Sequence, residues 1–379
     1  MKKLNLYTIV AFILFTSLSS YGQDATAFYN EGVKLKDQNV PLALEKFQKA
    51  ITLDPNYVAA IYECGWCQND LKNYNSAVEY LRKARTVWSA IPKIYFELGY
   101  AFEKLNNTDS AIKCYNRCLE LKPDYAGVYR QLGYIAYNKN DNAIALDYFK
   151  KYEAAATSAI TDYLYWYRKG YACNGLQDYG AAKTALRKSL SFKDDYLQTY
   201  LEIGFASTRL KTENEEAIGY YKKAIALDPK DHVAYNGIAE VYRDNKNDMT
   251  EAMEWYQKTL SVKPRERKAE FGMGYCLNST DKYAEAIPYL KIAVEEEPTY
   301  TAAFVELGYS HYMLSKFSDA IYYLRKAIDL NPETENAYYY SVLVYIAQKN
   351  KTMAQKMVDK LSDLSSKYVA TLQPKVNAL

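Results

Sequence analysis

Apolar side chains recur along this chain with the spacing of helices, and the helical pattern itself repeats about every 34 residues. Between Pro298 and Pro332, the residues Phe304, Leu307 and Gly308 follow the i, i+3, i+4 spacing of one helix face, without the alternation typical of a strand. The position of Gly308 recurs in ten copies: Gly32, Gly65, Gly99, Gly133, Gly170, Gly204, Ala239, Gly274, Gly308 and Val342. The pattern therefore predicts a chain of similar helical units.

A second position marks another helix in every unit. It corresponds to Ala320 and holds alanine in each copy: Ala43, Ala77, Ala111, Ala145, Ala182, Ala217, Ala252, Ala286, Ala320 and Ala354. Prolines follow in phase where a second helix should end, at Pro55, Pro123, Pro229, Pro264, Pro298 and Pro332. Each unit is therefore expected to hold two helices that approach closely, because the residues at their contact are small.

This unit resembles the tetratricopeptide repeat, a helix–turn–helix of about 34 residues with a W-x2-L-G-x2-Y…A-x3-F…A…P pattern. In the copy that starts at Thr301, the slots of that pattern hold Phe304, Leu307, Gly308, Ala320, Leu324, Ala327 and Pro332, while His311 stands in the tyrosine slot. The resemblance implies an all-α fold, a right-handed superhelical solenoid of about ten such units.

The repeat pattern also predicts the limits of the solenoid. Residues 25–334 are expected to form nine repeats, and residues 335–379 a degenerate tenth repeat that caps the end, since Val342 replaces the glycine and no proline closes the unit. The step from Gly133 to Gly170 is three residues longer than the usual step, and the excess falls within residues 152–160. We expect a lengthened helix or an altered angle between repeats there, rather than a domain boundary.

The N-terminus is typical of a bacterial secretory signal peptide. A basic Met1-Lys2-Lys3 precedes an apolar run, and Ser20 and Gly22 supply small residues before a cut at Gln23. The apolar run is shorter than the roughly 20 residues that span a membrane, so a retained anchor is the weaker reading, and no cysteine follows for lipid attachment. We therefore predict cleavage of residues 1–22 and export to the periplasm or beyond, with no transmembrane segment afterwards.

Composition excludes several function classes. Lys and Arg number 48 and Asp and Glu 45, so the chain has no charge excess that predicts nucleic-acid binding. Its only histidines are His232 and His311, and it lacks the common catalytic and phosphate-binding motifs. We therefore expect no enzyme, no catalytic residue, no metal site and no cofactor.

The cysteines do not change this expectation. Cys64 and Cys67 form a C-x-x-C, and Cys114 and Cys118 stand four apart. A thioredoxin-type motif needs a thiol at a helix N-terminus, whereas these cysteines fall in mid-helix. They are interpreted as small apolar fillers, and a disulfide stays possible in an oxidising compartment.

The strongest functional signal is a row of aromatic residues. In the family resembled, the first helix of each repeat lines the concave face, and the residue after the glycine position should point to that face. It is aromatic in seven of ten units, and residues four positions earlier lie on the same side of the helix. The candidate binding residues are Tyr62, Trp66, Phe96, Tyr100, Arg130, Tyr134, Tyr167, Tyr171, Phe205, Phe271, Tyr275 and Tyr309.

These residues predict an exported protein–protein interaction scaffold that binds a polypeptide segment along an aromatic-lined concave groove. The lysine-rich carboxylate clamp of the family is not expected, because only Arg130 is basic at the relevant slot. The row is expected to break at Glu240. Three alternatives stay open: rings that serve packing alone, a self-assembling element, or a carbohydrate-binding protein that uses the rings with nearby Asn69, Asp70, Glu103, Asn138 and Asn174.

Overall fold

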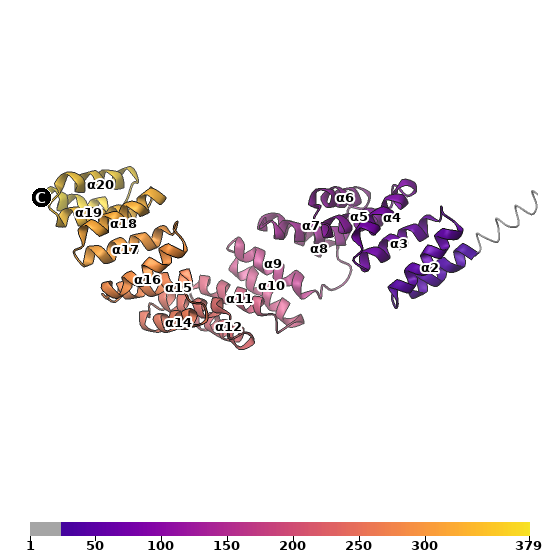
Figure 1. Ribbon diagram of the computed structural model, residues 1–379, viewed down its shortest axis with the longest axis horizontal. Coiled ribbons are helices and arrows are strands. Elements are labelled where there is room, and N and C mark those ends of the chain that lie inside the picture. Colours follow the sequence, from indigo (N-terminus) through magenta and orange to yellow (C-terminus); the bar gives the residue numbers. More distant parts are fainter. Residues whose placement is uncertain (1–23) are drawn as a thin grey trace, which may run out of the picture. The chain divides into compact units, whose positions relative to one another are not determined.

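The computed structural model of the protein describes residues 24–379, and every regular element in that range is a helix (Figure 1). The all-α prediction is confirmed. The predicted signal peptide, residues 1–22, lies outside the described residues. Within residues 24–379 no helix combines the length and the apolarity that crossing a bilayer requires.

The chain divides into two compact units, the first ending at Thr161 and the second beginning at Asp162. In the first unit, residues 24–35 are helical. They are followed by α2 (Val40–Leu53), α3 (Val58–Asp70), α4 (Tyr74–Val87), α5 (Pro92–Lys104), α6 (Thr108–Leu121), α7 (Ala126–Asn138) and α8 (Asn142–Ala155).

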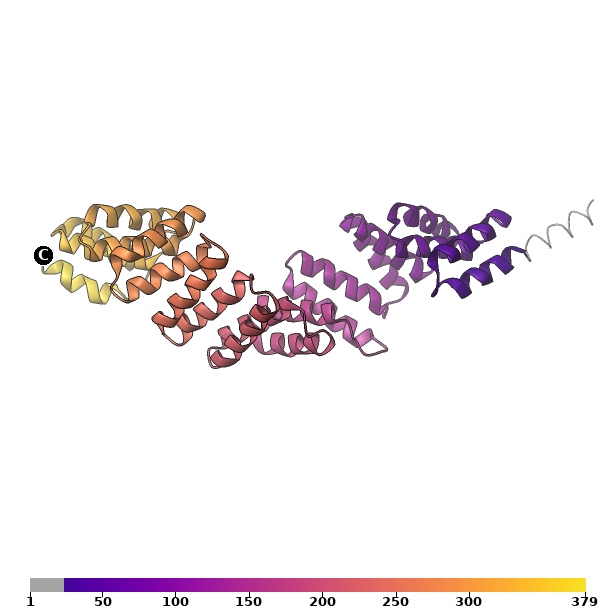
Figure 2. The same ribbon diagram turned by 60° about the horizontal axis from the view of Figure 1, so that its bottom comes forward.

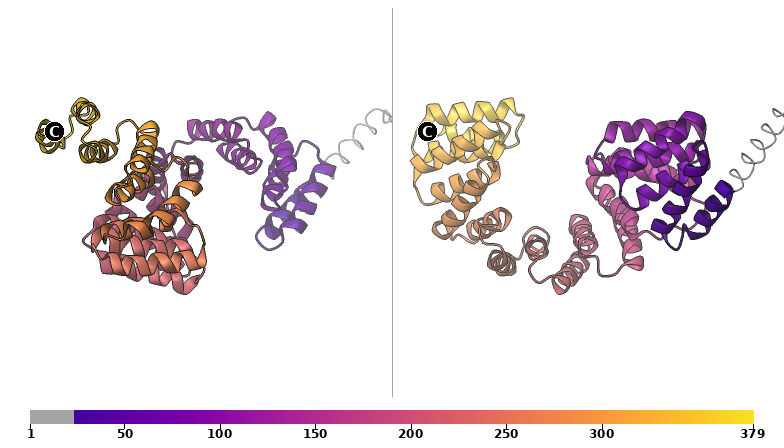
Figure 3. Two further views of the ribbon diagram at one scale, coloured as in Figure 1. Left: turned by 60° about the vertical axis from the view of Figure 1, so that its left-hand side comes forward. Right: turned by 45° about the vertical axis from the view of Figure 1, so that its right-hand side comes forward.

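The second unit continues the alternation of first and second helices, and the views of Figures 2 and 3 show its paired helices side by side. Its elements are α9 (Tyr163–Gly175), α10 (Tyr179–Phe192), α11 (Leu197–Leu210), α12 (Asn214–Leu227), α13 (His232–Glu240), the π-helix η1 (Val241–Asn245), α14 (Met249–Val262), α15 (Arg267–Ser279), α16 (Tyr283–Glu296), α17 (Thr301–Met313), α18 (Phe317–Leu330), α19 (Glu335–Ala347), α20 (Lys351–Asp363) and α21 (Val369–Asn377).

Within each unit the first helices of successive repeats pack on one another as well as on their own second helices. The pairs α3 and α5, α5 and α7, α9 and α11, α11 and α13, α13 and α15, and α15 and α17 are in contact. Second helices, by contrast, pack chiefly on the first helices before and after them. The first helices are therefore the closer-spaced layer, which is the inner layer of a curved stack.

The glycine position is explained by the second helix of the same repeat. A Cβ placed on Gly99 would lie 2.5 Å from Cε1 of Tyr115, and a Cβ on Gly133 would lie 2.4 Å from Cε1 of Phe149. Tyr115 and Phe149 are themselves fully buried. Because the large ring of one helix fills the space that a side chain on the other would need, a larger residue at Gly99 or Gly133 would force the two helices apart.

The three extra residues of the fourth repeat do not lengthen a helix, so the first of the two alternatives expected there is wrong. α8 has 14 residues, the same number as α6, and residues 156–162 are not helical. The last buried residue of α8 is Phe149, so no packing supports a further helical turn after Ala155. The chain divides into its two compact units at this segment, where we had not expected a boundary.

Two further features were not anticipated. The seventh repeat accommodates one extra residue as the π-helix Val241–Asn245, in which the amide of Lys246 donates to the carbonyl of Val241, five residues earlier. At the C-terminal end, α21 adds a helix after the degenerate repeat, and its Leu372 and Val376 are buried in a cluster with residues of α19 and α20. The predicted repeat limits, 25–334 and 335–379, stay a prediction.

Candidate binding site

The twelve predicted site residues all lie on first helices and are all half-buried. In the first unit, α3 carries Tyr62 and Trp66, α5 carries Phe96 and Tyr100, and α7 carries Arg130 and Tyr134. In the second unit, α9 carries Tyr167 and Tyr171, α11 carries Phe205, α15 carries Phe271 and Tyr275, and α17 carries Tyr309. Their burial fits both readings of the row, because a half-buried ring packs against the fold and keeps one surface open.

Four of the predicted residues come together in the first unit around an open pocket of about 320 Å³. Trp66, Phe96, Tyr100 and Arg130 line it from α3, α5 and α7. The other lining residues, apart from Tyr74, are polar or charged: Asn69, Asp70, Lys72, Glu97 and Gln131. Tyr62 and Tyr134 do not line this pocket. The arrangement offers aromatic walls with hydrogen-bonding groups between them, as ligand pockets commonly do.

The aromatic walls are held by contacts between rings of neighbouring elements. Tyr74, the first residue of α4, meets Tyr100 edge-on with ring centroids 6.3 Å apart. On the other side of the pocket, Phe96 stacks on Tyr125, which precedes α7, at 5.1 Å. Because each of these contacts joins rings of two consecutive repeats, the pocket forms only when those repeats are stacked.

Cations of the chain itself lie near several rings of the row. Nζ of Lys36 stands 3.9 Å from the ring centroid of Trp66 and also pairs with Glu63 at 2.5 Å. Nζ of Lys104 stands 5.1 Å from the Tyr100 ring centroid. These distances are typical of cation–π contacts. The aromatic surface is therefore interspersed with positive charge, and it does not favour a purely cationic ligand.

Arg130 is a polar group of the pocket with unused bonding capacity. Its Nε is buried and has no hydrogen-bond partner, and its guanidinium lies 6.0 Å from the ring centroid of Tyr152. A buried donor without an acceptor is costly, so this group would gain from a ligand carbonyl or carboxylate. The position of Arg130 in the predicted row made it a candidate, and the structure adds the unpaired donor.

Asn69 and Glu97 were not among the twelve candidates, yet both line the pocket. Nδ2 of Asn69 donates to the main-chain oxygen of Glu97 at 3.0 Å and to its Oε2 at 2.8 Å. Burial raises the pKa of the Glu97 carboxyl to about 7, against the opposing effect of that hydrogen bond. Glu97 lies outside the apolar slots of the repeat pattern, so nothing in the periodicity distinguishes it from an exposed acid.

On α15, in the second unit, the equivalent surface is occupied differently. On α15, the rings of Phe271 and Tyr275 lie beneath the guanidinium of Arg243, whose centre is 6.0 and 5.7 Å from their centroids. Arg243 belongs to the π-helix and makes two hydrogen bonds to Asp244, at 2.6 and 2.8 Å. The aromatic row is therefore interrupted near the predicted break at Glu240, by an arginine that covers two candidate rings.

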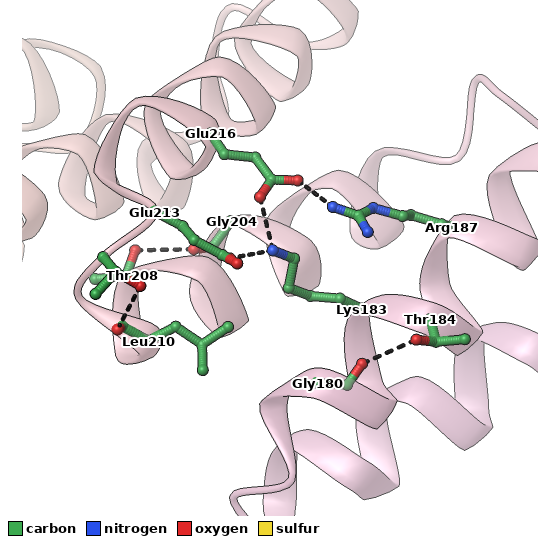
Figure 4. A network of polar contacts seen from close by, with 10 residues as sticks. Gly180, Lys183, Thr184, Arg187, Gly204, Thr208, Leu210, Glu213 and Glu216 are labelled. Carbon is green, nitrogen blue, oxygen red and sulfur yellow. Dashed lines mark hydrogen bonds and ion pairs between the residues drawn. The ribbon is translucent and has the colours of Figure 1, made fainter.

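Buried polar groups elsewhere join one repeat to the next. Lys183 of α10 is 5% exposed and reaches the carboxylates of Glu213 and Glu216, of which Glu216 is 2.6 Å away (Figure 4). Arg187 pairs with the other oxygen of Glu216. The figure shows these side chains meeting between two second helices, so we assign the network to stabilising the stack.

The six cysteines are all buried: Cys64, Cys67, Cys114, Cys118, Cys173 and Cys276. Burial raises the pKa of Cys64 beyond the usual range of thiols and that of Cys67 to about 12, so neither is an activated thiolate. Among residues 24–379 no cluster of three His, Cys, Asp or Glu side chains could hold a metal ion. The cysteines occupy packing positions, as predicted.

Comparison with known proteins agrees with the repeat geometry. Models of the tetratricopeptide repeat match residues 92–125, 163–196, 211–269 and 279–335. A search of curated proteins found no match. The helical stack is a repeat solenoid, and the chain is a tetratricopeptide repeat protein. Proteins with this fold are typically non-catalytic scaffolds that bind protein or peptide partners.

Several solved structures share the fold at low sequence identity. The Cut9–Hcn1 hetero-tetramer of the APC/C aligns with a TM-score of 0.53 and 14% identity, over 94% of this chain and 84% of that chain. PilW, a widely conserved type IV pilus biogenesis factor, aligns with a TM-score of 0.51 and 20% identity, over 57% of this chain and 100% of that chain. PilF of Pseudomonas aeruginosa aligns with a TM-score of 0.50 and 15% identity, over 56% of this chain and 97% of that chain.

Proposed function

We propose that the protein is an exported scaffold that binds an extended polypeptide segment along its first helices, with the pocket between α3, α5 and α7 as the principal anchor. The observation that carries this proposal is the pocket itself, where four of the predicted residues meet. Aromatic walls suit an apolar or aromatic side chain of the partner, since such side chains contribute most of the binding energy in many interfaces.

The polar groups of the pocket complement that side chain. The unpaired Nε of Arg130 can donate to a main-chain carbonyl of the bound segment. An extended segment advances about 3.3 Å per residue, and packed helices stand about 8–10 Å apart, so a segment would meet a new first helix every few residues. The proposal therefore predicts a short linear motif as the ligand of the first unit.

A peptide library displayed on phage, selected against the full chain, tests the proposal. Selected peptides should share a motif with an aromatic or large apolar residue, and Trp66→Ala should weaken their binding by about 30-fold, as loss of a hot-spot residue does. Tyr322→Ala is the matched control, because Tyr322 is 57% exposed on the second helix α18. A motif that binds Trp66→Ala as tightly as the unaltered chain contradicts the anchor.

A carbohydrate ligand is the second candidate, favoured by the amides and carboxylate beside the rings. Asn69, Asp70 and Gln131 line the same pocket as Trp66 and Tyr100. Stacking on a ring with flanking amides and carboxylates suits a sugar as well as a peptide. Specific signals on a glycan array, lost in Trp66→Ala, would support this candidate, and a blank array with a positive peptide selection would remove it.

Export rests on the N-terminal pattern alone. Cell fractionation followed by N-terminal sequencing should find the protein outside the cytoplasm and beginning at Gln23. Recovery from the cytoplasm with Met1 in place would contradict export, and it would leave the pocket proposal standing.

A further inference from the structure

Three junctions between repeats share a polar pair that recurs every third repeat. In each, an asparagine on a first helix is followed 28 residues later by a glutamate on the next first helix. The pairs are Asn69 with Glu97, Asn174 with Glu202, and Asn278 with Glu306, and equivalent members lie 104 or 105 residues apart. The repeats thus form blocks of three, and each block carries one such pair.

The geometry of the three pairs is nearly the same. The asparagine Nδ2 donates to the main-chain oxygen of the glutamate at 3.0, 3.1 and 3.2 Å, in chain order. It donates to the glutamate Oε2 at 2.8, 2.7 and 2.8 Å. A tyrosine at the start of the second helix packs edge-on against the ring three residues after the glutamate: Tyr74 on Tyr100, Tyr179 on Phe205, and Tyr283 on Tyr309.

The third pair differs from the other two in one hydrogen bond. Oδ1 of Asn278 accepts from the hydroxyl of Ser310 at 2.7 Å. The positions equivalent to Ser310 are Ala101 and Ala206, which have no donor to offer. Oδ1 of Asn69 and of Asn174 is accordingly buried without a partner, although these side chains are only 4% and 6% exposed. A buried acceptor that lacks a donor is costly, so the first two junctions need one from elsewhere.

The carboxyl group of the glutamate already accepts a hydrogen bond from Nδ2 of the same asparagine, so it lies next to the amide oxygen that lacks a donor. Burial raises the pKa of Glu97 to about 7 and also raises the pKa of Glu202 and of Glu306. Around Glu97 the surrounding charged and titratable groups are Lys36, Glu63, Tyr62, Asp70, Lys72, Tyr100, Tyr115, Tyr125 and Arg130. Tyr221 interacts with Glu202, and Tyr340 with Glu306. None of the groups near Glu97 pairs with its carboxylate through a salt bridge.

We propose that Glu97 and Glu202 hold a proton which their carboxyl groups donate to Oδ1 of Asn69 and of Asn174, so that each pair forms an acid–amide clasp between two repeats. The proton passes to solvent when the carboxyl ionises, and the clasp then loses that hydrogen bond. In the third block, the hydroxyl of Ser310 lies 2.7 Å from Oδ1 of Asn278 and 2.9 Å from the main-chain oxygen of Glu306, and it can donate to the amide oxygen at every pH. The pH thereby regulates how firmly α5 is held on α3, whichever partner the protein binds.

The direction of the pH effect follows from the raised pKa of Glu97. A carboxyl whose folded pKa lies above its unfolded value stabilises the fold fully below the unfolded pKa, near 4, and loses that contribution as the pH rises through about 7. The junction between α3 and α5 should therefore open more readily at pH 8 than at pH 6, by about tenfold for a group of this pKa.

Hydrogen–deuterium exchange of the full chain, corrected for intrinsic exchange rates and followed on peptides from α3 and α5, tests the proposal. The unaltered chain should lose protection about tenfold between pH 6 and pH 8. Glu97→Gln should abolish that change, because the amide of glutamine keeps a donor at every pH. Glu254→Gln, an exposed acid on α14, is the matched control and should leave the change intact. Persistence of the change in Glu97→Gln would overturn the proposal.

Two substitutions, one that adds the serine to the first block and one that removes it from the third, give a second, independent test. Ala101→Ser should place a hydroxyl where Ser310 has one and lower the pH midpoint at the first junction by roughly half to one unit. Ser310→Ala removes a buried hydroxyl without adding volume and should raise the midpoint on α15 and α17 by a similar amount. If Ala101→Ser fails to fold, Ser310→Ala decides, and an unchanged midpoint there contradicts the clasp.

Discussion

The helices α5 and α15 carry aromatic pairs at the same positions of their repeats, but the pair on α5 lines an open pocket, whereas an arginine of the chain lies over the pair on α15. Opposite Phe96 and Tyr100, the preceding first helix places Asn69, which bonds to Glu97. Opposite Phe271 and Tyr275, it places Arg243, which covers both rings. The residue facing the rings from the preceding repeat therefore decides whether an aromatic row is open to a ligand or closed by the chain itself.

The two helices also differ at the position of Glu97. Its counterpart on α15 is Gly272, and a Cβ there would lie 2.2 Å from Cζ of Tyr256. Tyr256 is fully buried and its ring also lies near Arg243, 5.8 Å from the guanidinium. On α15 the space of the glutamate is thus used for packing, whereas α5 keeps a polar side chain at the edge of the first unit's pocket.

The largest expected effect is a loss of stability when the helix packing that supports the first pocket is disrupted. Gly99→Leu should destabilise the first unit by about 3 kcal/mol, because its side chain would occupy the space of the Tyr115 ring. Thermal unfolding followed by circular dichroism should show a lower first transition while the second unit keeps its own. Gly180→Ala, at a glycine with nothing within 4 Å, is the control and should cost nothing. Equal effects of the two changes would refute the packing explanation.

A smaller loss of stability is expected when Arg243, which lies over the rings of Phe271 and Tyr275, is removed. Arg243→Ala should cost about 1–2 kcal/mol, since a partly desolvated cation over aromatic rings is lost. It should also expose Phe271 and Tyr275 to a bound apolar dye, measured by fluorescence enhancement. Arg325→Ala, which removes an exposed cation on α18, serves as the comparison variant. No gain in dye binding would mean that Arg243 does not close the pair.

The smallest loss of stability is expected at Tyr74 and Tyr283, which hold equivalent positions, and comparing the two distinguishes a role in packing from a role in binding. Tyr74→Ala and Tyr283→Ala each remove an edge-on contact, with Tyr100 and with Tyr309, and each should cost about 0.5–1.5 kcal/mol of stability. Only Tyr74→Ala should weaken a peptide selected on the full chain, because only Tyr74 lines the pocket. Chemical denaturation and calorimetry separate the two effects, and a similar binding loss in both variants would contradict the contrast.

The repeat fold was predictable from the sequence because glycine and alanine positions report close helix contacts directly. The break after α8 was not, since residues 152–160 hold several alanines and no proline, and only the end of the buried face at Phe149 shows why the helix stops. The π-helix was hidden for a similar reason. One extra residue in the seventh repeat is visible in the spacing, but the way a helix absorbs it depends on packing.

The site was predictable in part. The position after each glycine identified Trp66 and Tyr100 as residues of one surface, and the structure brings them together with Phe96 and Arg130. Asn69 was considered only as a neighbour of the rings, and Glu97 was not considered, because a glutamate in a helix is normally exposed. The covering of Tyr275 by Arg243 depends on contacts between repeats, which periodicity within one repeat does not contain.

The central claim is that the open pocket of the first unit, and not the aromatic row as a whole, anchors the partner. Calorimetric titration of one library-selected peptide into the full chain, Tyr100→Ala and Tyr275→Ala tests it most directly. The account predicts that Tyr100→Ala weakens binding by about 30-fold and Tyr275→Ala by less than about threefold. Equal losses in both variants, or a loss confined to Tyr275→Ala, would contradict it.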